Sequence, residues 1–181
     1  MAVAPHSRRP ITAGEILKAA TALLALTCAP NARGETAPSQ PIPIAVFDFD
    51  YSDSSGEARD QTREHQARTQ DFARRLREDL AASPQYLVVS IECPAPPCTA
   101  KSLAPDEVVA AAKRAGAKLI LYGGVHKMST LVQWASVELV DIEANRLLDD
   151  RFLSFRGDSD EAWRRAEAFV VEKMKARGPG E

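Results

Sequence analysis

Two aspartates at the end of an apolar segment have the types and the spacing to do chemistry. Residues 44–53 read IAVFDFDYSD, so Asp48 and Asp50 follow an apolar run and stand two positions apart. On an extended strand, residues two apart point to the same face. Such a carboxylate pair can act in phosphoryl transfer, with Asp48 as the nucleophile and Asp50 as the proton shuttle. The pattern therefore raises the hypothesis of a magnesium-dependent phosphatase.

The companions that this reaction needs are present, but each of them is unspecific. Ser90 would hold the phosphate, Lys113 or Lys118 would balance its charge, and residues 157–160 (GDSD) would bind magnesium. Phosphohydrolases of the haloacid-dehalogenase type also need helices between parallel strands, because all their motifs meet at one sheet edge. Residues 119–155 are instead predicted as consecutive strands. We therefore keep the phosphatase as an alternative and predict no catalytic residues.

The same segment is rich in oxygen ligands for a hard cation. Five carboxylates lie close together in the sequence: Asp48, Asp50, Asp53, Glu57 and Asp60. Calcium and the lanthanides take six or more oxygen ligands, which flexible acidic loops supply. The spacing does not match an EF-hand loop, so we favour a solvated acidic turn. A calcium or lanthanide site on Asp48, Asp50 and Asp53 is the alternative.

The N-terminal region has the organisation of a secretory signal peptide. Basic residues, Arg8 and Arg9 among them, precede the short apolar stretch 19–29 (AATALLALTCA), and small residues follow it. We predict residues 1–37 as a signal peptide and a periplasmic or secreted mature protein. A twin-arginine route and lipidation of Cys28 are weaker alternatives, because neither motif is complete.

Bulk composition favours one ordinary globular domain and argues against two classes of partner. The chain has 181 residues, of which 45% are hydrophobic, and a formal net charge of -2. This charge balance offers no electrostatic surface for nucleic acid. The mature region has no apolar run near the roughly 20 residues that span a bilayer, so we expect no transmembrane segment there.

Two cysteines remain after the signal peptide, and neither of the two histidines is placed for catalysis. Cys93 and Cys98 flank a Pro-rich tetrapeptide, and in an oxidising compartment such a close pair most simply forms a disulfide. Redox activity and metal binding are the alternatives. His65 lies beside a charged helix and is expected to be solvated. His126 follows an apolar strand and is expected to be a surface or hydrogen-bonded residue.

The order of predicted elements is β-α-β-α-β-β-β-α, which defines a single α/β domain with α+β character. Its mixed sheet has about five strands, and the helices pack on it. Asp158 is predicted as the N-cap of the last helix, with Glu161 completing a capping box. We expect strands over residues 44–49, 86–91, 118–125, 131–140 and 147–155, and helices over 64–82, 105–115 and from 159 to about 177. A Pro-rich linker (38–43) precedes this domain (44–177), and a disordered tail (178–181) follows it.

Several of these segments together resemble one family, the small uncharacterised secreted proteins of proteobacteria classed as a domain of unknown function (2380/3280 type). The segment FRGDSDEAW at residues 155–163 is the most specific of them. The others are IAVFDF at 44–49, LAAS at 80–83, YLVV at 86–89, the paired cysteines and RAGA at 114–117. The layout is also similar to the amino-terminal domain of TolB. The resemblance implies an interaction module without established catalytic residues.

We therefore expect a non-enzymatic accessory or protein-interaction module of the cell envelope. Its partner would be an unidentified periplasmic protein, and no cofactor is expected. Family members encoded near quinoprotein alcohol dehydrogenase systems suggest one alternative, a calcium- or lanthanide-binding accessory protein of such a system. The magnesium-dependent phosphatase that uses Asp48 and Asp50 is the other alternative.

Overall fold

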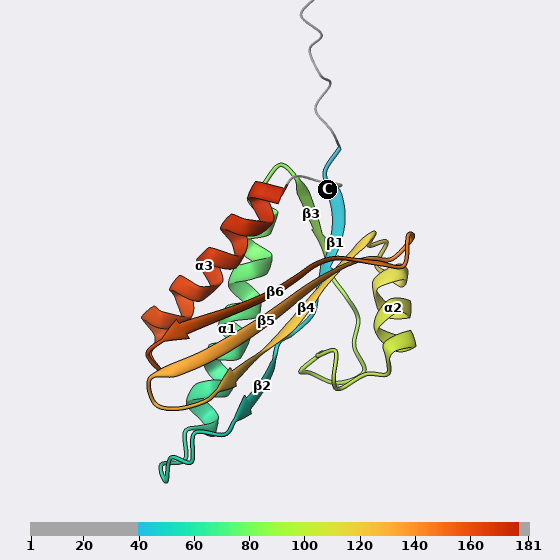
Figure 1. Cartoon of the computed structure of the whole chain (residues 1–181). Helices are drawn as coiled ribbons and strands as arrows, with labels where there is room; N and C mark the ends of the chain where they lie inside the picture. The colour runs from blue at the N-terminus through green and yellow to red at the C-terminus, as the bar shows by residue number, and fades with distance from the viewer. Residues whose placement is uncertain (1–39, 178–181) are drawn as a thin grey trace, which may run out of the picture. The chain divides into compact units, whose positions relative to one another are not determined.

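The computed structural model describes residues 40–177, which form six strands and three helices (Figure 1). The predicted signal peptide, Cys28 and the predicted tail lie outside these residues. Within the described range, no helix is long and apolar enough to cross a membrane. The elements in chain order are β1 (Ile42–Val46), β2 (Asp50–Asp53), α1 (Thr62–Ala81), β3 (Tyr86–Val89), α2 (Pro105–Arg114), β4 (Leu119–Lys127), β5 (Val132–Asp141), β6 (Arg146–Arg156) and α3 (Asp160–Arg177).

All six strands belong to one mixed sheet, which confirms the predicted fold class. The strand order is β3-β1-β4-β5-β6, and β2 pairs with β4 beyond the end of β1. β1 runs parallel to β3 and β4, whereas β4, β5 and β6 form an antiparallel meander. The sheet has one strand more than expected because the predicted first strand ends at Val46 and the chain resumes pairing as β2.

The first strand begins earlier than its sequence predicts. β1 starts at Ile42, inside the predicted linker. Pro43 lies within this strand, and its carbonyl oxygen accepts a hydrogen bond from the backbone N–H of Lys118. Proline has no N–H to donate to a ladder, so its presence in the sequence suggested a linker.

Two helices cover one face of the sheet, and one helix covers part of the other (Figure 1). The α1–α3 layer packs a large apolar cluster against β1, β4 and β5. On α1 this cluster uses Phe72, Leu76 and Leu80, whose spacing of four residues places them on one side of the helix. α2 packs a smaller cluster, including Phe47 and Ile120, on the opposite face. The rest of that face, over β4, β5 and β6, is covered by no helix of the described residues.

The predicted cap of the last helix is wrong. The hydroxyl oxygen of Ser159 accepts a hydrogen bond from the backbone N–H of Ala162 at 3.3 Å, so Ser159 caps α3. Asp158 turns inward instead, because buried cations attract its carboxylate. Glu161 makes no capping box, and its carboxylate pairs with Arg164 and Arg165.

Candidate functional site

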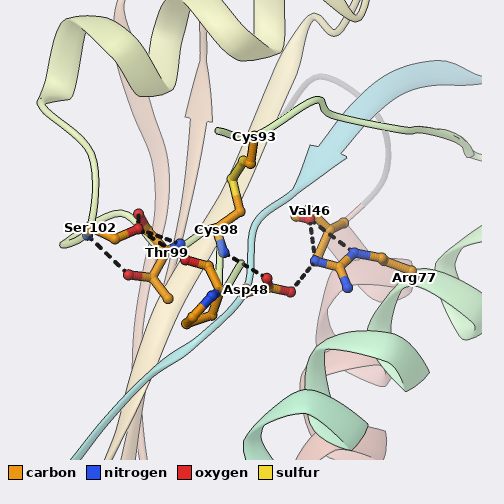
Figure 2. Close-up of a disulfide and its surroundings, with 8 residues drawn as sticks. Val46, Asp48, Arg77, Cys93, Cys98, Thr99 and Ser102 are labelled. Atoms are coloured by element: carbon orange, nitrogen blue, oxygen red, sulfur yellow. Dashed lines mark hydrogen bonds and ion pairs between the residues drawn. A yellow bond between two sulfur atoms is a disulfide. The ribbon is translucent and has the colours of Figure 1, made fainter. Parts of the chain in front are cut away.

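Asp48, the proposed nucleophile, is held by protein donors on both of its carboxylate oxygens (Figure 2). Arg77 of α1 donates to Oδ1 at 2.7 Å, and the backbone N–H of Cys98 donates to Oδ2 at 2.8 Å. Arg77 also donates to the carbonyl oxygen of Val46. A nucleophilic carboxylate needs an oxygen that faces its substrate. The geometry therefore gives Asp48 a structural task, in which it joins α1 to the cysteine loop.

The cysteine loop is closed by a disulfide. Cys93 and Cys98 are bonded, with their Cα atoms 5.9 Å apart (Figure 2). Cys98 is buried in the α2 cluster. The backbone N–H of Asp48 donates to the carbonyl oxygen of Cys98 at 2.8 Å, and Thr99 and Ser102 form a hydrogen-bonded turn behind it. The end of the loop is thus fixed by the disulfide and by backbone contacts to Asp48.

The three predicted metal ligands do not share a binding point. Asp48 has the partners just given, whereas Asp53 accepts from the backbone N–H of Ser55 at 2.8 Å and lies 3.9 Å from the ammonium of Lys127. Asp50 stands on β2 opposite Gly124. Among residues 40–177, no group of three or more His, Cys, Asp or Glu side chains is placed to hold a metal ion. Calcium or lanthanide binding stays a prediction.

Asp48 and Asp50 are nevertheless brought to one hollow. This hollow of about 520 Å³ lies between β2, α1 and the cysteine loop, and Gln66, Gln70 and Thr99 also line it. Asp50 lines a second hollow as well, of about 200 Å³, on the uncovered part of the sheet. No hydrogen bond or ion pair within the described residues engages the carboxylate of Asp50. Asp50 is therefore an unpaired charge between two hollows.

Aromatic side chains line the second hollow. Trp134 of β5 and Phe152 of β6 meet edge to face with ring centroids 5.3 Å apart, and His126 lies 6.1 Å from Trp134. Gly124, Ser136 and Lys101 also line it. Phe152 is 62% exposed. We call this surface, lined by Asp50, Lys101, Gly124, His126, Trp134, Ser136 and Phe152, the aromatic hollow.

Polar contacts hold two of the side chains on this face of the sheet. His126 hydrogen-bonds to Ser52 through Nδ1 at 2.9 Å and to Ser54 through Nε2 at 2.7 Å, which confirms the expectation of a hydrogen-bonded residue. Tyr122 donates to the carboxylate of Glu138. Burial and this hydrogen bond raise the pKa of Tyr122 to about 12. Tyr122 therefore stays neutral, and the carboxylate of Glu138 places a negative charge in the row beside the aromatic hollow.

Sequence reasoning missed a buried ion network on the opposite face. Asp158 lies at its centre and accepts from His65 and Lys127 at 2.9 Å and from Arg68 at 2.7 Å. Lys127 is fully buried and also pairs with Glu57 at 2.7 Å. His65 is 1% exposed, so the expectation that it is solvated is wrong. The ring of His65 stacks on a tyrosine, Tyr51, at 4.6 Å.

The charges of this network stabilise one another. Burial alone would raise the pKa of Asp158, but hydrogen bonds from Lys127 and His65 hold it below its usual range. Burial would likewise lower the pKa of Lys127, and hydrogen bonds to Glu57 and Asp158 raise it. Since these groups satisfy each other, the network is a structural feature. The sequence signal that could have revealed the buried lysine is the period-two alternation along residues 119–127, because it places Lys127 on the side of the strand that faces the core.

The sequence matches the family model DUF3280, described as "Protein of unknown function (DUF2380)", over residues 43–174. The chain belongs to this family, which confirms the resemblance drawn from the sequence. No curated protein matches the chain.

Solved structures of bacterial proteins have a similar arrangement. A PelC dodecamer from Paraburkholderia phytofirmans is 12% identical at a TM-score of 0.49, with 78% of this chain and 91% of that chain covered. TolB from Acinetobacter baumannii is 16% identical at 0.47, with 76% of this chain and 28% of TolB covered. The C-terminal domain of LpoB from Salmonella enterica is 12% identical at 0.42, with 64% of this chain and 82% of that domain covered.

Proposed function

We propose that this chain is a non-enzymatic protein-interaction module of the bacterial cell envelope. It acts in the periplasm and binds a segment of a partner protein on the uncovered part of its sheet. The observation that carries this proposal is the aromatic hollow, where an exposed phenylalanine, a half-buried tryptophan and an unpaired carboxylate lie together on a part of the sheet that no helix of residues 40–177 covers. Exposed apolar surface beside polar groups is typical of interaction sites.

The charges around the aromatic hollow favour a basic segment as the occupant. Asp50 lines the hollow without a partner among the described residues, and the carboxylate of Glu138 lies in the next row of the sheet. Lys101 supplies one positive charge to the lining. A lysine or arginine side chain could pair with Asp50 and lie against the ring of Trp134. We therefore expect the partner to insert a cationic side chain here.

Periplasmic action is supported by two features of the chain. The N-terminal sequence has the organisation of a secretory signal peptide. The Cys93–Cys98 disulfide suits an oxidising compartment, because disulfides are rare in the reducing cytosol. Both features favour export, and neither identifies the partner.

Site-specific photo-crosslinking in the producing cells tests this function. A photoreactive phenylalanine analogue in place of Trp134 should cross-link to one periplasmic protein. The same analogue in place of Leu87, which is 52% exposed on β3, serves as the matched control. We expect the cross-linked peptide to contain lysine or arginine, and the yield to fall about tenfold or more in an Asp50→Asn background, since charge-assisted pairs are worth roughly 1.5–3 kcal/mol. Equal yields at both positions, or a yield that Asp50→Asn leaves unchanged, would overturn the proposal.

A further inference from the structure

We infer that a second copy of this chain pairs with the edge strand β6, so that two antiparallel β6 strands join the two sheets into one. The dyad of this pairing passes beside Leu153. The inference goes beyond the proposed function and rests on separate observations, the free edge of β6 and the order of charges along it.

β6 is a long strand with a free edge. It has 11 residues, and within the described part of the chain it pairs with β5 alone. The backbone N–H and C=O groups on its outer side are therefore available to another strand. Natural proteins usually keep such edge strands short, cover them or interrupt them with a β-bulge, because a long free edge strand can pair with a strand of another chain.

Exposed apolar side chains lie beside this edge on both faces of the sheet. Phe152 is 62% exposed on one face, and Phe169 of α3 is 41% exposed on the other. Leu147, near the start of β6, is 50% exposed. A hollow of about 380 Å³ between β6 and α3 is lined by Leu153, Phe155 and Phe169 among others. An added strand would cover apolar surface on both of its sides.

The sequence of β6 is complementary to itself in an antiparallel register centred on Leu153. When two copies of RLLDDRFLSFR pair about Leu153, Asp150 of each copy lies opposite Arg156 of the other. Phe152 then faces Ser154, and Leu153 meets its own copy. Opposite charges that face each other across an antiparallel pair stabilise it, and this register forms the ion pair twice.

Most other registers bring like charges together or lose the ion pairs. A dyad at Leu148 also forms two ion pairs, between Arg146 and Asp150, but it joins only residues 146–150 of each strand, whereas the dyad at Leu153 joins residues 150–156. A dyad at Arg151 places this arginine opposite its own copy and Arg146 opposite Arg156, which is unfavourable. A dyad at Phe152 pairs Asp150 with a serine and leaves both charges unmatched. Charged residues on an edge usually discourage pairing. Here the order of their signs and the longer overlap together favour the register centred on Leu153.

Asp150 and Arg156 are free to make these pairs. Both are exposed, and they alternate with Phe152 and Ser154 on the same face of the strand. Within residues 40–177, neither side chain has a hydrogen-bond or ion-pair partner. On the other face, Arg151 would lie opposite Phe155 of the second copy, where a guanidinium can contact the ring. The pairing thus satisfies charges that the single chain leaves open.

Sedimentation equilibrium of the purified full chain tests this inference by charge exchange. We expect a concentration-dependent dimer. Asp150→Arg and Arg156→Asp should each raise the dimer dissociation constant about tenfold or more, because each variant sets two like-charge pairs across the dyad. The double exchange Asp150→Arg with Arg156→Asp should restore the dimer. Glu92→Arg serves as the control. It reverses an exposed charge just after β3, at the other edge of the sheet, and should leave the dimer dissociation constant unchanged.

A second measurement covers the case in which a charge variant folds poorly. Residues at the dyad of an antiparallel pair have Cα atoms about 4.5–5.5 Å apart, within the range of a disulfide. Leu153→Cys should therefore form a covalent dimer on mild oxidation, and Leu147→Cys, away from the dyad, should not. The inference is wrong if the chain stays monomeric at every concentration. It is also wrong if the double exchange dimerises no better than the single variants or if the two cysteine variants cross-link equally.

Discussion

Glu167 is a carboxyl group inside the layer formed by α1 and α3. It is 3% exposed, and its Oε1 atom has no hydrogen-bond partner among the described residues. The indole N–H of Trp163, one turn earlier on α3, is buried without a partner as well. Burial and the nearby carboxylates of Asp79 and Asp71 raise the pKa of Glu167 to about 7, against the opposing effect of Arg75. Glu167 is therefore protonated in the folded chain at mildly acidic pH.

This pKa predicts a pH-dependent stability. Between pH 4.5 and about 7 the unfolded chain has lost a proton that folded Glu167 still holds, so the fold loses stability as the pH rises through this range. Glu167→Gln removes the titration. We expect it to raise the free energy of unfolding by about 1–3 kcal/mol at pH 8 and to change it little at pH 4.5. Urea unfolding at both pH values measures this, with the exposed Glu172→Gln as the control. An equal effect of Glu167→Gln at the two pH values would contradict the assignment.

At the scale of elements, local patterns predicted most of the fold. The helical spacing of Phe72, Leu76 and Leu80 and the apolar alternation of β4 and β5 gave the right elements, because each pattern lies within one element. The break between β1 and β2 was missed because the apolar run continues through Phe47 and Phe49. These two side chains pack into clusters on opposite faces of the sheet.

The candidate site was predicted less completely because its contacts are non-local. Asp158 follows a glycine and precedes a helix, so local rules assign it as a cap. Its actual partners, His65 and Lys127, lie far away in the sequence. Asp50 was singled out as a candidate metal ligand, which stays a prediction. The aromatic rings that share its hollow come from β5 and β6, and the register of those strands could not be read from the sequence.

The ion network around Asp158 links the ends of three elements and predicts a large stability effect. It joins the first two turns of α1, the end of β4 and the segment before α3. Asp158→Ala removes one of the two close carboxylate partners of buried Lys127 and the shared acceptor of His65 and Arg68, so we expect a loss of about 3–5 kcal/mol in the free energy of unfolding. Asp160→Ala removes only an 84% exposed carboxylate that pairs with Arg68, and should cost less than about 1 kcal/mol. Denaturant unfolding compares the two. Similar losses in both variants would show that the network contributes little.

At the scale of the whole domain, the helices cover the sheet unequally. The α1–α3 layer closes one face, whereas α2 and the cysteine loop close only the end of the other face near β1 and β3 (Figure 1). Asp48 connects these two sides, because it binds Arg77 from the α1 layer and the backbone of Cys98 from the loop. The residue that first suggested catalysis thus holds the two layers in place across the sheet, beside the surface that is left open.

This role predicts that Asp48 matters for stability more than for any reaction. Asp48→Ala removes the carboxylate that pairs with Arg77 and leaves the backbone N–H of Cys98 without an acceptor. We therefore expect the free energy of unfolding to fall by about 2–4 kcal/mol. The double variant Cys93→Ser with Cys98→Ser opens only a short loop, and Asp48 still binds the end of that loop. It should therefore lower the free energy of unfolding by about 2 kcal/mol. Thermal and urea unfolding rank the variants, and hydrogen exchange should show Asp48→Ala loosening both α1 and the cysteine loop. An aryl phosphatase activity that is present in the native chain and lost in Asp48→Asn would instead make Asp48 a nucleophile.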